Sequence, residues 1–127
     1  MRWKNAEAAG RLEERRKREA DAPRLSATVP ALEKLRLECS ERSANIVRPE
    51  HTHTRHVMVQ SAPALFVLPC HDSRCKDGGH DLTATILAAL KKKQERFTGE
   101  DACPGVVGTA ACSRVLDYVG VATYQAR

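Results

Sequence analysis

Four cysteines in two pairs are the side chains of this sequence that are best suited to metal chemistry. Four residues separate the first pair and eight separate the second, which gives Cys70, Cys75, Cys103 and Cys112. Each pair lies in a segment of turn-forming residues beside an apolar, strand-like run. Structural zinc takes four ligands at tetrahedral angles, and thiolate sulfur is one of its preferred donors. Two turns that each supply two thiolates therefore predict a structural four-cysteine site, with Zn2+ as the cofactor and no catalytic residues.

Glycines surround both cysteine pairs. Because glycine has no Cβ, the backbone at these positions can approach a metal site closely. Backbone N–H groups can also donate hydrogen bonds to ligand sulfurs. We expect both roles from Gly78, Gly79, Gly105 and Gly108.

Three other interpretations of the cysteines stay open at this point. In the first, His80 or His71 replaces one cysteine as a ligand. In the second, the four thiolates hold an iron–sulfur cluster, although the usual cluster spacings are absent. In the third, the cysteines bind no metal and are reduced or paired as disulfides. The fifth cysteine, Cys39, alternates with leucines and is expected to be a buried, inert thiol.

The paired cysteines at two turns of a small sheet resemble the zinc-ribbon group of domains. The resemblance covers about residues 64–124 and implies the same four ligands around one zinc. Ribbons usually have two residues between the cysteines of a pair, whereas this chain has four and eight, with a helix between the pairs. The pattern C-x4-C-x-D-G-G-H-D is also similar to that of an uncharacterised bacterial protein group, and this likeness implies no activity.

Two groups of histidines are further candidates. His51, His53 and His56 predict either a second metal site or exposed histidines at the start of a strand, and we favour the second interpretation. The neighbours His80 and Asp81 invite a catalytic interpretation, but adjacent residues seldom face one another. We expect Asp81 to cap a helix and His80 to donate a hydrogen bond to a ligand thiolate.

Periodicity predicts the elements that position the cysteines. An alternating run over residues 35–39 is typical of a half-buried strand. Residues 64–68 are apolar on both faces, as in a central strand. A helix is expected over residues 82–96, where an apolar stripe faces the core. Further strands are expected over residues 57–60, 97–102 and 115–124, with a polar loop over 41–53.

These elements predict an α+β fold, with a mostly antiparallel sheet of four to five strands, one main helix and a zinc staple. Residues 4–20 contain strong helix formers and almost no apolar stripe, and residues 21–31 contain two prolines. We therefore expect a charged N-terminal helix or tail and a linker over residues 1–28, followed by the zinc-stapled domain over 29–127.

Charge and hydropathy bear on the location of the protein and on its partners. The formal net charge is +5, and more than half of the excess lies in residues 1–24. No run reaches the roughly 18 apolar residues of a membrane span, and no signal sequence is evident, so we expect a cytoplasmic protein without a membrane partner.

Two classes of function fit these observations. The first is a non-enzymatic binding or adaptor module, whose partner is a protein or, on weaker grounds, a nucleic acid. The second is a thiol-based redox or metal-handling protein, or an enzyme, that uses an exchangeable metal site. We favour the first because a closed site of four thiolates leaves no position open for a substrate.

Overall fold

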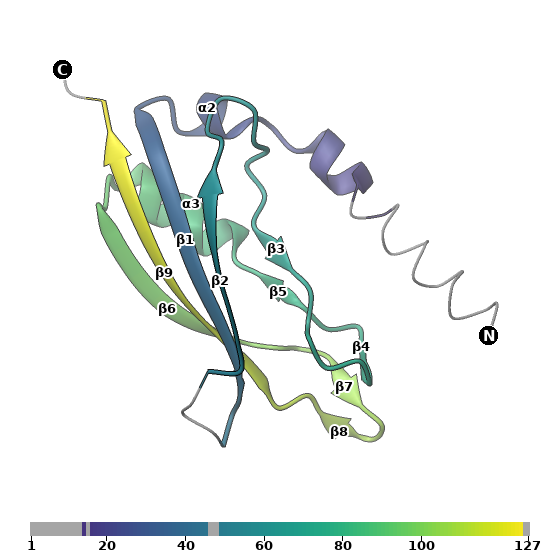
Figure 1. Cartoon of the computed structure of the whole chain (residues 1–127). Helices are drawn as coiled ribbons and strands as arrows, with labels where there is room; N and C mark the ends of the chain where they lie inside the picture. Colours follow the sequence, from purple (N-terminus) through teal and green to yellow (C-terminus); the bar gives the residue numbers. More distant parts are fainter. Residues whose placement is uncertain (1–13, 15, 46–48, 126–127) are drawn as a thin grey trace.

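A computed structural model describes residues 14, 16–45 and 49–125 of the chain. Its main sheet has four strands in the order β2-β1-β9-β6, and every neighbouring pair is antiparallel (Figure 1). The two long strands at the centre pair with each other along nearly their whole length. This architecture confirms the predicted α+β fold. The bounds of the strands are β1 Leu32–Ser43, β2 His51–Val57, β6 Arg96–Ala102 and β9 Arg114–Tyr124.

Two smaller sheets accompany the main one. β3 (Val67–Leu68) pairs with β5 (His80–Asp81). The other small sheet, at the lower end of the molecule in Figure 1, has three strands in the order β4-β7-β8. The bounds of its strands are β4 Cys75–Lys76, β7 Val106–Val107 and β8 Ala110–Ala111.

The predicted central strand over residues 64–68 is wrong. Only Val67–Leu68 is a strand, and it pairs with β5 outside the main sheet. Prolines at both ends of this segment, Pro63 and Pro69, lack the N–H group that a ladder requires. The segment is rich in apolar residues because Ala64 and Phe66 pack into the core from a layer that covers the main sheet.

The main helix, α3 (Thr83–Lys91), begins as predicted and ends five residues early. The chain leaves the helix through Lys93, which has a φ of 58°, and then enters β6. The N-cap position belongs to Leu82 rather than to Asp81. The carboxylate of Asp81 nevertheless accepts the N–H of Thr83 at 3.1 Å, so it still satisfies a donor in the first turn.

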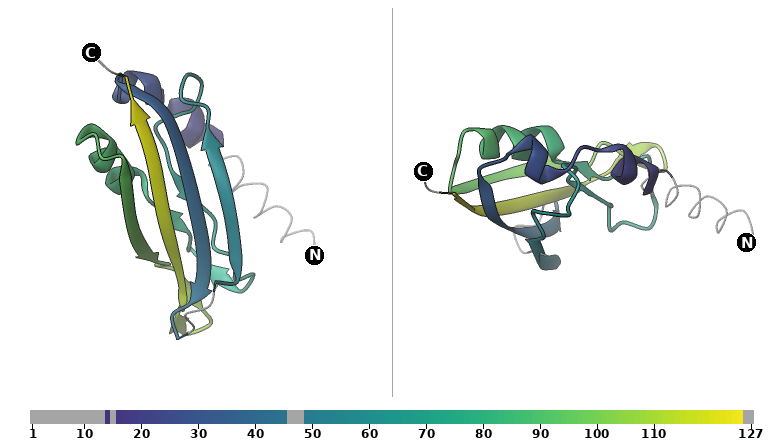
Figure 2. Two further views of the ribbon diagram at one scale, coloured as in Figure 1. Left: turned by 60° about the vertical axis from the view of Figure 1, so that its left-hand side comes forward. Right: turned by 90° about the horizontal axis from the view of Figure 1, so that it is seen from above.

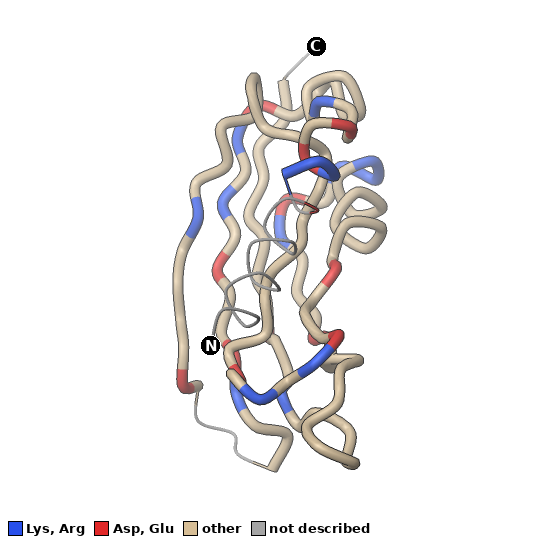
Figure 3. Tube along the Cα trace, turned by 90° about the vertical axis from the view of Figure 1, so that its right-hand side faces the viewer, with Lys and Arg blue, Asp and Glu red and all other residues tan. Residues whose placement is uncertain are grey.

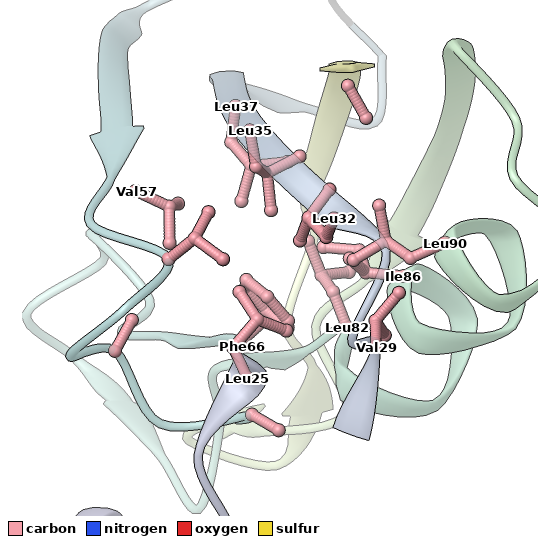
Figure 4. Close-up of a cluster of buried hydrophobic side chains, with 14 of the residues drawn as sticks. Leu25, Val29, Leu32, Leu35, Leu37, Val57, Phe66, Leu82, Ile86 and Leu90 are labelled. Carbon is pink, nitrogen blue, oxygen red and sulfur yellow. The ribbon is translucent and has the colours of Figure 1, made fainter. Parts of the chain in front are cut away.

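The core lies between the main sheet and the two helices, α3 and the short α2 (Leu25–Thr28), which sit on the same side of the sheet (Figure 2). Inward-facing leucines of β1 meet Ile86 and Leu90 of α3, both fully buried (Figure 4). Cys39 lies among these residues, 2% exposed, and burial raises the pKa of its thiol. The prediction of a buried thiol in the core is confirmed.

The N-terminal segment reaches the domain before the expected boundary. Residues 16–21 are helical, and Arg18 pairs with Asp81 at 3.2 Å. Most of the helix expected over residues 4–20 lies outside the described residues. Leu25 has no exposed surface and belongs to the core cluster. The boundary between residues 28 and 29 stays a prediction. Leu25, which precedes this boundary, packs into the core formed by residues that follow it.

We expect Leu25→Ala to lower the free energy of unfolding by about 2–5 kcal/mol, because it leaves a cavity in the core. A chain that begins at residue 22 should lose about 1 kcal/mol or less, since the Arg18–Asp81 ion pair that it gives up is exposed and contributes little. Denaturant unfolding of the two proteins measures both effects. Equal losses would contradict a core role for Leu25.

Within the described residues, no helix has the length and apolar character needed to cross a bilayer.

Candidate metal centre

The four predicted cysteines, named here the cysteine cluster, converge beside the small sheet of β4, β7 and β8, whose strands are labelled near the bottom of Figure 1. Cys70 follows β3 and Cys75 begins β4. Cys103 follows β6 directly, and Cys112 lies between β8 and β9. Backbone hydrogen bonds hold the second pair, from Cys103 N–H to the Arg114 carbonyl and from Cys112 N–H to the Gly105 carbonyl, each at 2.9 Å.

The sulfur atoms of the cysteine cluster have the spacing of a tetrahedral thiolate site. All four Sγ atoms lie within 4.8 Å of one another. The Sγ atoms of Cys70 and Cys112 are 3.8 Å apart. Those of Cys75 and Cys103 are 3.7 Å apart. A zinc–sulfur bond of about 2.3 Å gives tetrahedral edges of about 3.8 Å, whereas a disulfide needs a bond of about 2.05 Å. The four cysteines are therefore positioned to hold one metal ion.

Gly78 and Gly105 lack a side chain where the cysteine sulfurs lie. A Cβ at Gly78 would lie 2.4 Å from the Cys75 sulfur and 2.5 Å from the Cys103 sulfur. A Cβ at Gly105 would also lie 2.4 Å from the Cys75 sulfur. The close approach predicted for these two glycines is confirmed. At Gly108 nothing lies within 4 Å of a Cβ, and its φ of +63° serves the turn between β7 and β8 instead.

Backbone N–H groups donate to two of the sulfurs. The N–H of Gly79 reaches the Cys103 sulfur at 3.3 Å, and the N–H of Asp72 reaches the Cys70 sulfur at 3.5 Å. Burial opposes ionisation of Cys103, but N–H donors from Gly79 and Gly105 outweigh it and lower its pKa. Burial raises the pKa of Cys70, and raises that of Cys75 to about 11. Cys70 and Cys75 therefore resist ionisation without a cation, whereas Cys103 ionises more readily.

A buried carboxylate, Glu41 of β1, supports the turn that carries Cys70. Its side chain is 1% exposed. It accepts the N–H of His71 at 3.1 Å and the Nε–H of Arg114 at 2.9 Å. It also pairs with His71 Nδ1 and lies 4.0 Å from the Cys70 sulfur. Glu41 therefore ties the first cysteine turn to the central strand of the main sheet.

Arg114 completes this network. Its Nη1 atom donates to Glu50 at 3.0 Å and to Ser43 at 3.1 Å. Burial acts to raise the pKa of Glu41, but hydrogen bonds from His71 and Arg114 outweigh it and lower the pKa. Glu41 is therefore a buried, ionised carboxylate.

The prediction of a polar loop over residues 41–53 misplaced Glu41. β1 continues to Ser43, and β2 begins at His51. The period-two alternation of Leu35, Leu37 and Cys39 continues to position 41 and was the signal that could have found it.

Neither candidate histidine belongs to the cysteine cluster. His71 pairs with Glu41, as described above. His80 is fully buried, and its Nδ1 atom lies 2.8 Å from a carboxylate oxygen of Asp101. Its Nε2 atom has no hydrogen-bond partner among the described residues. The predicted hydrogen bond from His80 to a thiolate is therefore wrong. The Asp81 carboxylate instead pairs with Arg18, at 3.2 Å.

The other three histidines lie exposed on the edge strand β2, as expected. His51 stacks on His71, with ring centroids 4.7 Å apart and planes 16° from parallel. The nitrogen lone pair of an imidazole lies in the plane of its ring. Because the two ring planes are nearly parallel, the lone pairs of His51 and His71 do not point toward one shared ion. Within the described part of the chain, only the cysteine cluster groups three or more metal-ligating side chains at coordination distance.

No protein-family model matches this chain, and neither the curated proteins nor the solved structures contain a significant match. The likeness to zinc ribbons therefore rests on the cysteine cluster alone.

The glycine contacts lead to a test. We expect Gly78→Ala to weaken metal binding by about 10–100-fold, the range for residues that support metal ligands, because the new methyl group must displace two sulfurs. Gly108→Ala is the matched control, since its methyl group meets open space and costs only about 1–2 kcal/mol of backbone strain. Competition with a chromogenic chelator measures both affinities. Equal affinities for the two variants would argue against the sulfur packing around Gly78.

Proposed function

We propose that this chain is a small zinc protein with a structural four-cysteine site, and that it acts as a non-enzymatic binding or adaptor module. The observation that supports this most directly is the convergence of four sulfurs within 4.8 Å around glycines that leave room for them. Cys70, Cys75, Cys103 and Cys112 would hold the ion. Bound zinc would cross-link the turns that carry these cysteines. Its role would be structural rather than catalytic, because four protein ligands leave no coordination position for water or substrate.

The small sheet beside the cluster explains why a staple is needed. Its three strands, β4, β7 and β8, have two residues each. Strands this short do not form a stable sheet alone. Few apolar side chains are buried near them, so metal binding would contribute folding free energy to this end of the molecule.

The same proposal extends to domains and location. We propose that residues 29–127 form the zinc-stapled domain and that residues 1–28 form a charged helix or tail with a linker. None of the five cysteines is paired in a disulfide. Cysteines without disulfides suit a reducing compartment such as the cytoplasm.

A second candidate is a thiol-based redox or metal-handling role. The half-buried state of Cys70 and Cys75 favours it, because an oxidant or a competing chelator can reach those two sulfurs. The role would then depend on exchange of the metal rather than on its retention.

Elemental analysis of purified protein tests the proposal, with thiol titration before and after chelation. About one zinc per chain and four thiols that become reactive only with chelation and unfolding are expected for the structural site. A metal-free protein with an intact fold would refute it. A protein that stays folded without zinc and oxidises reversibly would support the second candidate.

A further inference from the structure

The face of the main sheet opposite the helices carries a second surface of interest. Side chains of β1 and β9 alternate between the core and this outer face. On β1, Arg36 and Glu38 are exposed there, between buried Leu35, Leu37 and Cys39. The described helices α2 and α3 lie on the other side of the sheet (Figure 2), so neither of them covers the outer face.

One row of this face concentrates positive charge. In the strand register, His56 lies opposite Arg36, Arg36 opposite Val121, and Val121 opposite Arg96. Two strand spacings separate Arg36 from Arg96, which places their backbones roughly 10 Å apart. Lys34 lies opposite Thr123 beside this row. The two guanidinium groups and the ammonium group therefore emerge from one end of an otherwise flat surface.

A groove of about 410 Å³ accompanies the row. Val121 and Thr123 of β9 line this groove, together with the carboxylate of Glu33. Two cations and one imidazole also line it, from Lys34, Arg36 and His56.

Three more lysines flank the same end of the sheet. They are exposed and lie at the end of α3, just before β6. The Ala122 N–H donates to the Glu95 carbonyl at 2.8 Å, which ties this segment to β9 beside the row. Figure 3 shows several Lys and Arg positions, interspersed with Asp and Glu positions, in the half of the trace nearest the C-terminus. The basic band, as we name it, consists of Lys34, Arg36, Lys91, Lys92, Lys93 and Arg96.

Carboxylates elsewhere on the outer face do not neutralise the basic band. Asp117 and Glu100 both pair with Arg42, at 2.8 and 3.1 Å. Within the described residues, no carboxylate forms an ion pair with any member of the band. Glu33, Glu38 and Glu95 lower the net charge of this end, but the six cations of the band outnumber them, so their guanidinium and ammonium groups can pair with an external anion.

We infer that the basic band binds the phosphate backbone of a nucleic acid. Arg36 and Arg96 lie in one exposed row of the sheet with Lys34 beside it, and the three lysines at the end of α3 extend the positive charge around the same end. Clustered cations suit a chain that carries one charge per nucleotide, and guanidinium groups pair with phosphate through two parallel hydrogen bonds. In the described residues, the Phe and Tyr side chains in the sheet face the core, so stacking on bases plays no part. The contact is sequence-independent. This inference rests on the proposed binding-module function and names its partner.

Fluorescence anisotropy with a labelled single-stranded deoxythymidine 20-mer tests it, using zinc-loaded full-length protein between 50 and 200 mM salt. The double variant Arg36→Gln/Arg96→Gln should bind at least tenfold more weakly at 50 mM salt. Its slope of log affinity against log salt should be shallower by about 1.4, since each lost phosphate contact removes about 0.7. The control Arg24→Gln/Arg55→Gln loses the same charge at exposed arginines that lie outside the band and away from the cysteine cluster, and it should keep the slope.

Three results would overturn the inference. The first is no binding of the 20-mer at 50 mM salt. The second is an equal loss of affinity in the control, which would indicate net charge rather than the band. The third is equally tight binding of poly-glutamate, which would indicate an acidic peptide partner. Circular dichroism and zinc content are measured on the same samples. A folded, zinc-loaded protein that fails to bind refutes only this inference, whereas a metal-free folded protein refutes the proposed function.

Discussion

Cys103→Ala is expected to release the metal and to destabilise the end of the molecule that contains the cysteine cluster. Cys103 is 6% exposed, its sulfur accepts the Gly79 N–H, and its own N–H bonds to the carbonyl of Arg114. Structural zinc sites contribute about 10–16 kcal/mol in apparent binding free energy, so one ligand of four accounts for about 100-fold or more in affinity. We expect the melting temperature to fall by about 10 °C or more, because each kcal/mol shifts it by several degrees.

The matched control is Cys39→Ala. Cys39 is also buried, but it lies in the core among leucines, away from the cysteine cluster. This variant should keep one metal per chain and lose only about 1 kcal/mol of stability, as for a small buried side chain. Metal content by elemental analysis and melting followed by circular dichroism separate the two variants. Full metal content in Cys103→Ala would contradict the four-ligand site.

Hydrogen exchange shows which strands lose stability when the metal is removed. Chelation of the wild-type protein should remove protection from β4, β7 and β8 first, because those two-residue strands depend on the staple. The long strands β1 and β9 should keep their protection better, since they pair over eleven register positions. Added zinc should restore the lost protection. Uniform loss over the whole sheet would show that the metal supports the fold globally rather than at one end.

Glu41→Gln should produce the second large effect. Breaking a buried ion pair by removing one partner costs about 3–5 kcal/mol, because the remaining charge stays buried and uncompensated. Arg114, 9% exposed, would keep Ser43 and the carboxylate of Glu50, whose side chain is 38% exposed. We expect a cost of about 3 kcal/mol, toward the lower end of that range, because Glu50 still offsets part of the charge.

The metal should also bind more weakly in this variant. Glu41 positions the backbone of His71, directly after Cys70, through hydrogen bonds at 3.1 and 3.3 Å. Loss of residues that orient ligands typically costs about 10–100-fold in metal affinity. Glu38→Gln is the matched control, because Glu38 lies on the same strand and is exposed on the outer face. It should change stability by less than about 0.5 kcal/mol. Similar unfolding midpoints for the two variants would contradict the role of Glu41.

Local sequence was enough to predict several elements of this fold. The alternation over 35–39 predicted an inward face of β1, because side chains on a strand alternate strictly between two faces. The β-rich run at 115–124 predicted the central strand β9 within one residue of its observed start. The start of α3 was predicted by the turn residues before it and the apolar stripe that follows. Each of these signals lies within a few neighbouring residues.

The sequence predicted which four cysteines form the cluster but not which of their sulfur atoms are neighbours. Spacing placed two cysteines at each of two turns, yet the hydrogen-bonding sulfur pairs join the turns, Cys70 to Cys112 and Cys75 to Cys103. Which sulfurs become neighbours depends on how β4, β7 and β8 dock, and sequence spacing carries no information on that docking.

Other features depended on packing between distant segments. Residues 64–68 were predicted as a central strand because an apolar run looks the same in a sheet as in a layer that covers one. Glu41 was assigned to a polar loop, although Arg114, 73 residues away, offsets the cost of its burial through charge pairing. The sequence by itself therefore determined β1 and β9, the helix start and the four cysteines that could hold a metal ion, because local periodicity and side-chain chemistry specify them. Only the tertiary structure decided the sulfur neighbours, the covering layer and the buried carboxylate, because long-range contacts create their surroundings.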